Sequence, residues 1–285
     1  MDIFVDNQLD IFNCPEVHVP KFPSTINTQP STNYQTINHL TLFLPYEPTI
    51  AGKAINVHLI LEYLAFFLAF RYYVFLRKRQ VDTISTDNRL SIILGAILGA
   101  LVGSRLVGYL ENPVLISSLE QLLQLMNIKT IMGGLFGGLL GVETAKKIIG
   151  EKQSSGDLFT LPIIVGIFIG RIGCFLMGIK EFTYGKVTTF PLGMDLGDGL
   201  LRHPLAAYEL VFLVGLFWLL KRFRERKNLE NGMLFKLFML SYFGFRFLLE
   251  FLKPNVFFVL GLSSIQWLCV ICFVYYRRVL GVKIS

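Results

Sequence analysis

Charged residues are scarce in this sequence. Asp, Glu, Lys and Arg make up 16% of the 285 residues, whereas hydrophobic residues make up 53%, and the mean hydropathy is +0.55. Soluble domains contain about 25% charged residues, so this chain would expose far too much apolar surface to water. The composition excludes an ordinary soluble protein and predicts an integral membrane protein.

Cysteine is scarce as well, and the first residues lack the marks of a processed leader. The four cysteines (Cys14, Cys174, Cys269 and Cys272) show no metal-ligand spacing with histidine, so we expect apolar structural cysteines and no metal site. The segment MDIFVDNQLDIFNCPEVH has neither the basic region nor the long apolar run of a signal peptide. Nothing before Cys14 resembles a lipobox, so we do not expect the chain itself to be a lipoprotein.

Apolar stretches long enough to cross a membrane recur along the chain. A hydrocarbon core about 30 Å thick needs about 20 helical residues. We place seven spans, at residues 54–76, 90–110, 128–146, 158–179, 204–220, 233–252 and 256–276. The segment 114–126 is apolar on one side only and is expected to lie along the membrane interface. We therefore predict an all-α bundle of about seven transmembrane helices over residues 53–285, preceded by a polar, proline-rich extracytoplasmic arm over residues 1–52.

The basic residues predict the orientation of these spans. With the N-terminus outside, the inner side holds 16 Lys and Arg residues and the outer side holds 7. Positive charge accumulates on the cytoplasmic side, so we expect the C-terminus to be cytoplasmic. Topology then accounts for the net charge of +7, and no nucleic-acid partner is expected.

Three arginines remain inside the predicted spans, namely Arg105, Arg171 and Arg246. Each would cost about 2.5–3.5 kcal/mol near the bilayer centre without a partner. The carboxylates available to compensate them are Glu62, Glu209 and Glu250. Their positions along the predicted helices place all six in the outer half of the bilayer.

Two explanations fit these buried charges. Arg246 and Glu250 lie four residues apart, so they can form a structural ion pair on one helix face. Alternatively, the guanidinium groups bind a lipid phosphate, for which their planar shape is suited. The glycines of GGLFGGLLG (133–141) and GRIG (170–173) serve either close helix packing or a phosphate-binding cavity. We favour an anionic-lipid site that opens to the outer leaflet.

Six short motifs follow one another between residues 54 and 276. They are GSRL (103–106), MGGLFG (132–137), GRIGCFLMGI (170–179), YGKVT (184–188), RHPLAAYE (202–209) and YFGFRFLLEFLKP (242–254). Their content and order resemble the prolipoprotein diacylglyceryl transferase family. The resemblance implies a multi-pass, seven-helix enzyme of the bacterial inner membrane. Such enzymes transfer the diacylglyceryl group of phosphatidylglycerol to the lipobox cysteine of a preprolipoprotein, so those two molecules are the implied partners.

The resemblance also implies roles for the polar residues. The implied catalytic residues are Arg171, Arg246, Glu250, Tyr242 and His203; the implied phosphate-binding residues are Arg105, Arg171, Arg246, Gly133 and Gly134; the implied supporting residues are Glu62, Glu209, Tyr208 and Gly185. In the family's reaction the arginines hold the phosphate while the acceptor thiolate attacks the glycerol carbon that bears it. No cofactor is implied. The thiol needs a base, and His203, Glu181 and Glu62 are open candidates.

Several family positions differ in this chain. The histidine of the family's H-G-G motif is Met132, two signature asparagines are Cys174 and Met177, and the signature glutamate is Ile179, with Glu181 two residues later. These losses favour an alternative function, a non-catalytic paralogue that binds an anionic lipid or a lipoprotein precursor. A transport path is a further alternative, but the sequence shows neither internal repeats nor polar residues in the inner half of the spans.

Overall fold

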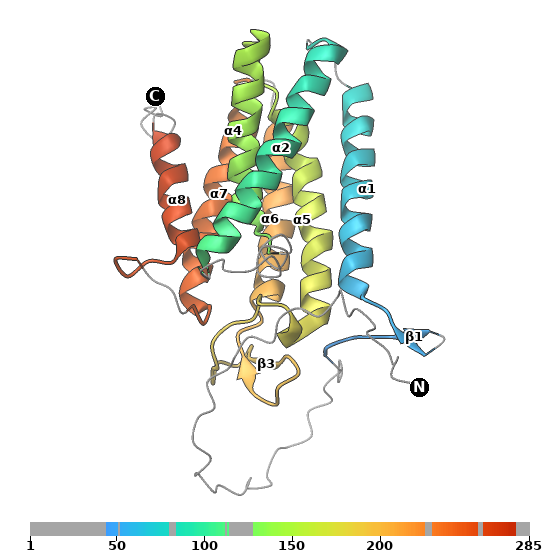
Figure 1. Cartoon of the computed structure of the whole chain (residues 1–285), viewed down its shortest axis with the longest axis vertical. Coiled ribbons are helices and arrows are strands. Elements are labelled where there is room, and N and C mark those ends of the chain that lie inside the picture. Colours follow the sequence, from blue (N-terminus) through green and yellow to red (C-terminus); the bar gives the residue numbers. More distant parts are fainter. Residues whose placement is uncertain are drawn as a thin grey trace, which may run out of the picture. The chain divides into compact units, whose positions relative to one another are not determined.

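Helices dominate the part of the chain that the computed structural model describes, residues 44–50, 52–79, 84–111, 113, 128–225, 230–255 and 259–277. The α-helices there are α1 (Val57–Lys78), α2 (Thr86–Glu111), α4 (Ile131–Ile149), α5 (Asp157–Met177), α6 (Leu205–Arg224), α7 (Met233–Leu249) and α8 (Ser264–Tyr275). Short 3-10 turns, η1 (Gly178–Lys180) and η2 (Glu250–Leu252), follow α5 and α7. Strands β1 (Thr49–Ile50) and β2 (Lys53–Ala54) form one antiparallel hairpin, and β3 (Met194–Asp195) and β4 (Leu201–Arg202) form another. Figure 1 shows the helices side by side, with β1 and β3 at one end of the bundle.

The predicted helical architecture is confirmed for the described residues, since each of the seven predicted spans overlaps one α-helix. The seventh prediction, 256–276, was too long at its start. Residues Val259 and Leu262 pair in a tight turn, in which Leu260 and Gly261 have φ angles of 53° and 77°. Helix α8 begins only after Ser263, whose side chain caps it together with Gln266. The predicted interfacial segment 114–126, and most of the predicted arm, lie outside the described residues.

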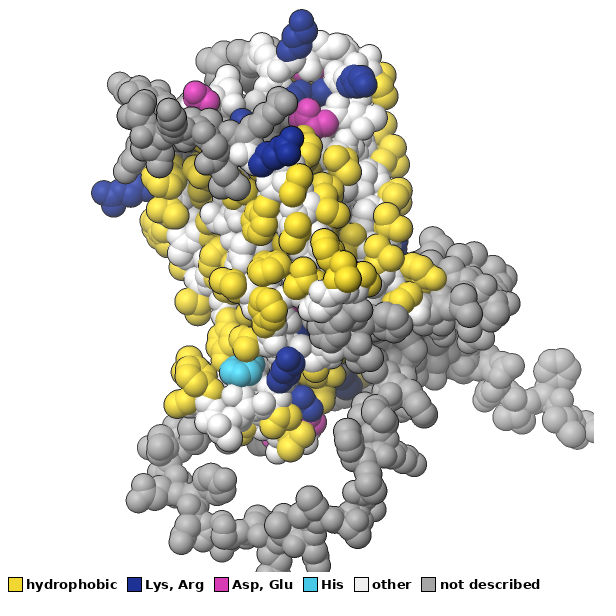
Figure 2. All heavy atoms as spheres, turned by 90° about the vertical axis from the view of Figure 1, so that its left-hand side faces the viewer, with side chains coloured by type: hydrophobic (Ala, Val, Ile, Leu, Met, Phe, Trp, Pro, Cys, Tyr) yellow, Lys and Arg dark blue, Asp and Glu magenta, His cyan; other side chains and the backbone are white. Residues whose placement is uncertain are grey.

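Some of these helices are suited to cross a membrane. Among the described residues, three segments are long and apolar enough to do so: Val57–Lys78, Thr86–Glu111 and Asp157–Lys180. Large apolar side chains on α1 and α2 point away from the protein, including Phe66 at 69% exposed and Leu90 at 67%. Figure 2 shows hydrophobic side chains covering the middle of one face, with Lys and Arg gathered toward the two ends. Such a surface matches hydrocarbon and not water.

Glycines hold α2 and α4 in very close contact. A Cβ atom built on Gly137 would lie 2.3 Å from the carbonyl oxygen of Gly99, and one built on Gly103 would lie 2.4 Å from that of Gly133. Gly141 similarly approaches Gly95, at 2.1 Å from its carbonyl oxygen. Any side chain at these positions would therefore push the two backbones apart. The glycines of 133–141 were expected to serve either close helix packing or a phosphate-binding cavity. These contacts support close packing.

The core lies around α5, α6, α7 and α8. The side chains of Leu213, Phe238, Met239 and Phe243 are fully buried and pack in one apolar cluster. Met132 from α4 belongs to the same cluster and is 1% exposed. Met132 stands where the family motif has the H-G-G histidine, so that position belongs to the apolar core in this chain.

We expect Gly137→Ala to lower the thermal stability of the detergent-solubilised protein. The added methyl group would overlap the Gly99 carbonyl, and overpacking of this kind costs about 1–3 kcal/mol. Gly134→Ala is the matched control, because its Cβ would meet nothing closer than 3.7 Å. Thermal unfolding followed by size-exclusion chromatography measures the difference; equal melting temperatures for the two variants would contradict the proposed packing.

Candidate functional site

The residues of the six sequence motifs lie toward one end of the bundle. The Tyr46 amide donates to the Leu176 carbonyl at 2.8 Å, and the Ile179 amide donates to the Leu196 carbonyl at 3.0 Å. These bonds fix the segment before β1 and the β3 region against the C-terminal end of α5. Arg171 lies six residues before that end, about 9 Å along the helix axis, so it sits just beneath this loop layer.

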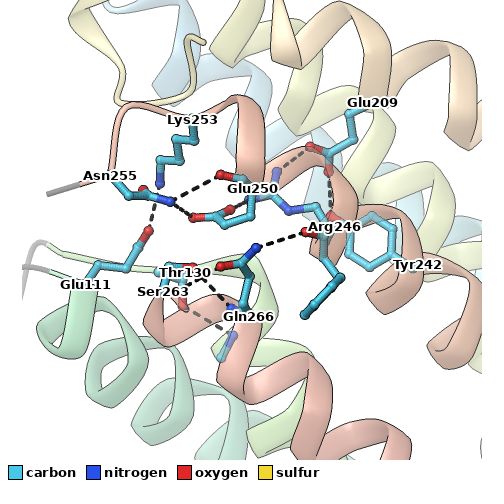
Figure 3. A network of polar contacts seen from close by, with 12 residues as sticks. Glu111, Thr130, Glu209, Tyr242, Arg246, Glu250, Lys253, Asn255, Ser263 and Gln266 are labelled. Carbon is cyan, nitrogen blue, oxygen red and sulfur yellow. Dashed lines mark hydrogen bonds and ion pairs between the residues drawn. The ribbon is translucent and has the colours of Figure 1, made fainter. Parts of the chain in front are cut away.

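Glu209 joins two arginines from different helices. Its Oε1 atom lies 2.9 Å from Nε of Arg171 on α5, and its Oε2 atom accepts from Nη1 of Arg246 on α7 at 3.0 Å. The hydroxyl of Tyr242 donates to Oε1 at 2.5 Å. Figure 3 shows Glu209, Tyr242 and Arg246 converging between α6 and α7. Because Glu209 is only 1% exposed, one carboxylate holds two buried guanidinium groups at a fixed separation.

A second carboxylate holds the other side of Arg246. Nη2 of Arg246 lies 3.5 Å from Oε2 of Glu250, and the Asn255 side chain donates to Oε1 of Glu250 at 2.8 Å. Tyr242, Arg246 and Glu250 are spaced four residues apart, so successive helical turns place them in one row. The expected Arg246–Glu250 pair is present, and it is one part of a larger network (Figure 3).

The guanidinium groups retain donors for an anionic ligand. A guanidinium carries five N–H groups. Among the described residues, Nε of Arg171 and Nε of Arg246 make no hydrogen bond of good geometry, so the close approach of Arg171 Nε to Glu209 is an ion pair only. Nη1 of Arg171 donates to a weak acceptor, the sulfur of Cys174 at 3.8 Å. A phosphate oxygen would satisfy these groups better than a thiol does.

Arg105 lies at the same end of the bundle but outside this network. Its helix ends at Glu111, which accepts from Lys253 at 2.7 Å and so ties α2 to the end of η2. Among the described residues, the Arg105 guanidinium donates only to Ser104 Oγ, at 3.4 Å, and has no ion pair. The structure thus joins two of the three arginines predicted to lie inside the membrane spans, and a phosphate contact by Arg105 stays a prediction.

Other predicted site residues have partners elsewhere. Glu62 was expected to compensate the arginines, but both its oxygens lie 2.5 Å from Lys129 Nζ. That expectation was wrong, because the nearest cation comes from the segment before α4. His203 and Tyr208 contact each other, with Nδ1 3.1 Å from the hydroxyl, and Gly185 donates its amide to the His203 carbonyl at 2.9 Å. These three residues fix the loop that covers the site.

The predicted glycine ligands are already hydrogen-bonded. The amide of Gly133 donates to Thr130 Oγ1 at 3.2 Å, and the amide of Gly134 donates to the Thr130 carbonyl at 3.0 Å. Thr130 is the N-cap of α4, so these bonds belong to the start of the helix. They leave no free amide donor for a phosphate at either glycine.

The sequence interpretation did not assign a role to His58. Its Nε2 atom lies 3.6 Å from Cys174 Sγ, and its Nδ1 atom lies 3.3 Å from Oε1 of Glu181. A Cβ on Gly173 would lie 2.7 Å from the imidazole, so the lack of a side chain there lets His58 pack against α5. A histidine in an otherwise apolar stretch was the available signal, but only the structure shows which residues it meets.

Glu209→Gln is expected to destabilise the protein more than any surface Glu→Gln change. The variant leaves two buried guanidinium groups without their shared anion, and breaking a buried ion pair costs about 3–5 kcal/mol. Glu143→Gln on the exposed face of α4 is the control, for which a change within about 0.5 kcal/mol is expected. Melting temperatures in detergent test this; similar values for both variants would show that Glu209 does not carry the network.

Comparison with known proteins agrees with the motifs. The sequence pattern of the family described as "Prolipoprotein diacylglyceryl transferase" matches residues 48–280. Three similar proteins bear the name phosphatidylglycerol–prolipoprotein diacylglyceryl transferase. They come from Wolbachia sp. subsp. Brugia malayi (33% identical, 62% of this chain and 66% of the relative), Nitratidesulfovibrio vulgaris strain DP4 (37%, 66% and 70%) and Bordetella bronchiseptica (33%, 67% and 73%).

The chain thus spans about two thirds to three quarters of the length of these relatives. The family match covers all six motifs, including the helices that carry Arg171, Glu209 and Arg246. The resemblance inferred from those motifs is confirmed: the chain belongs to the prolipoprotein diacylglyceryl transferase family.

Proposed function

We propose that this protein transfers the diacylglyceryl group of phosphatidylglycerol to the lipobox cysteine of a preprolipoprotein. The observation that carries the proposal is the pair of buried guanidinium groups that share Glu209. They lie on family motifs, and the names of the relatives specify this lipid and this acceptor. Arginine in a low-dielectric site stabilises charge that grows on a departing phosphate.

Each residue of the network has a task in this reaction. Arg171 and Arg246 hold the phosphate of phosphatidylglycerol, and Glu209 keeps their side chains in place. Glu250, itself held by Asn255, orients Arg246. The acceptor sulfur forms a bond to the glycerol carbon that bears the phosphate. The carbon–oxygen bond breaks, its electron pair stays on the phosphate oxygen, and glycerol phosphate leaves.

The proposed setting is the bacterial inner membrane, crossed by about seven helices. Helices α1, α4 and α6 begin at the end that carries the site, and each has basic residues in its last turn at the opposite end, such as Arg77, Lys147 and Arg222. This distribution supports a cytoplasmic face opposite the site. The N-terminus would be outside, the C-terminus would be cytoplasmic, and the site would open to the outer leaflet.

A non-catalytic lipid-binding paralogue is the second candidate. Met132 in the core, and the buried Cys174 and Met177 at the signature asparagine positions, support it. Both candidates need the arginine network, so only a transfer assay separates them.

Expression in a bacterial strain depleted of its own diacylglyceryl transferase should restore growth and lipoprotein modification. Arg246→Ala should abolish rescue, because loss of one donor to the developing anion lowers the rate by about 100-fold or more. Arg222→Ala, an exposed arginine at the other end of α6, is the matched control and should rescue. Lack of rescue by a well-expressed, membrane-inserted wild-type protein would favour the non-catalytic paralogue.

Reporter fusions test the proposed orientation. Alkaline phosphatase inserted at Gly199, in the β3–β4 loop, should be active because the loop would be extracytoplasmic. A fluorescent protein fused after Ser285 should fluoresce, because the C-terminus would be cytoplasmic. The reverse pattern would overturn the orientation and the outer-leaflet site with it.

A further inference from the structure

A histidine stands beside the arginine network on α1. His58 is the second residue of that helix, whose first turn is capped by Asn56. Its side chain is 17% exposed and contacts Glu181 in the covering loop and Cys174 on α5, three residues after Arg171. Gly173 provides the space in which the imidazole rests on α5.

The contacts of His58 define how its two nitrogens can be used. Nδ1 faces the carboxylate of Glu181 at 3.3 Å, and Nε2 faces the thiol of Cys174 at 3.6 Å. A carboxylate at Nδ1 stabilises the tautomer with its proton on Nδ1, which leaves Nε2 as an acceptor. The imidazole therefore presents a basic nitrogen toward a thiol.

One sulfur atom separates that basic nitrogen from the guanidinium of Arg171. The Cys174 sulfur contacts His58 on one side and Nη1 of Arg171 on the other, at 3.8 Å. Glu62, four residues further along α1, is paired with Lys129. The contacts thus form a spatial row of a carboxylate, an imidazole, a thiol and a guanidinium.

The other candidate bases are occupied or absent. The position of the family histidine is Met132 in the apolar core. His203 is bound to Tyr208, and Glu62 is bound to Lys129. Of the two histidines in the described ranges, only His58 contacts residues that reach the arginine network.

We propose that His58 is the base that activates the acceptor cysteine, with Glu181 as its positioning residue. This inference rests on the proposed transferase function. The acceptor S–H proton moves to Nε2 of His58, the sulfur attacks the glycerol carbon, and glycerol phosphate leaves. The imidazolium then returns its proton to water. The resident Cys174 thiol marks a place where a sulfur meets both groups, and the acceptor reaches Nε2 when the Cys174 side chain rotates away.

Purified protein in mixed micelles with phosphatidylglycerol and a lipobox peptide tests the role of His58. We expect His58→Gln to lower kcat by about 100-fold or more, the usual contribution of a general base, while KM for phosphatidylglycerol changes little. Added imidazole should restore part of the activity of His58→Ala, a rescue that a merely structural role would not produce. Glu181→Gln should lower kcat less than His58→Gln does, with Glu143→Gln as its matched control.

The outcomes separate the two proposals. Absence of transfer by the wild-type protein overturns the proposed function and this inference together. If His58→Gln transfers at the wild-type rate, only the role of His58 is overturned. The same holds if His203→Gln loses transfer activity while His58→Gln keeps it. If Cys174→Ala lowers kcat as much as His58→Gln does, the chemistry belongs to the resident thiol, and the proposed role of His58 is also overturned. Partial rescue of His58→Ala by imidazole, in a variant that unfolds at the wild-type temperature, supports it.

Discussion

The Glu209 carboxylate compensates two positive charges that the fold could not otherwise bury. Arg171 and Arg246 come from α5 and α7, and Glu209 comes from α6, so the interaction also sets how these three helices meet. Removing an ion from water costs several kcal/mol, and shared pairing with good geometry offsets that cost. Two further residues support this shared pairing. Tyr242 donates to Glu209, and Glu250 accepts from Arg246 on the other side.

The rest of the bundle keeps this cluster in place from two directions. On one side, the glycine contacts bring α2 and α4 together and leave no room for side chains between them. On the other, the loop from η1 to β4 is fixed by backbone bonds to α5 and to η2, including the bond from the Lys186 amide to the Leu252 carbonyl. A preorganised site needs this kind of support, because guanidinium groups that could drift would lose their fixed separation.

The lengths of the apolar stretches were enough to predict the seven helices, and the four-residue spacing was enough to predict the pair of Arg246 and Glu250. Neither could show that Glu209 serves both arginines, or that Glu62 pairs with Lys129, because such contacts depend on how separate helices are rotated about their axes. His58 went unassigned for the same reason, since its partners are more than 100 residues away in the sequence. The start of α8 was misplaced because the apolar run 256–276 hides the tight turn at Leu260 and Gly261.

The burial of Met132 limits which residue can stand at this position. A histidine restored at this position alone would enter a close-packed apolar cluster, and an unpaired buried polar group costs about 1–3 kcal/mol. Met132→His alone is therefore expected to lower the free energy of unfolding unless a neighbouring helix supplies a hydrogen-bond partner. An apolar side chain at position 132 thus contributes to holding α4 against the core, a task that a lone histidine in the same place would not perform.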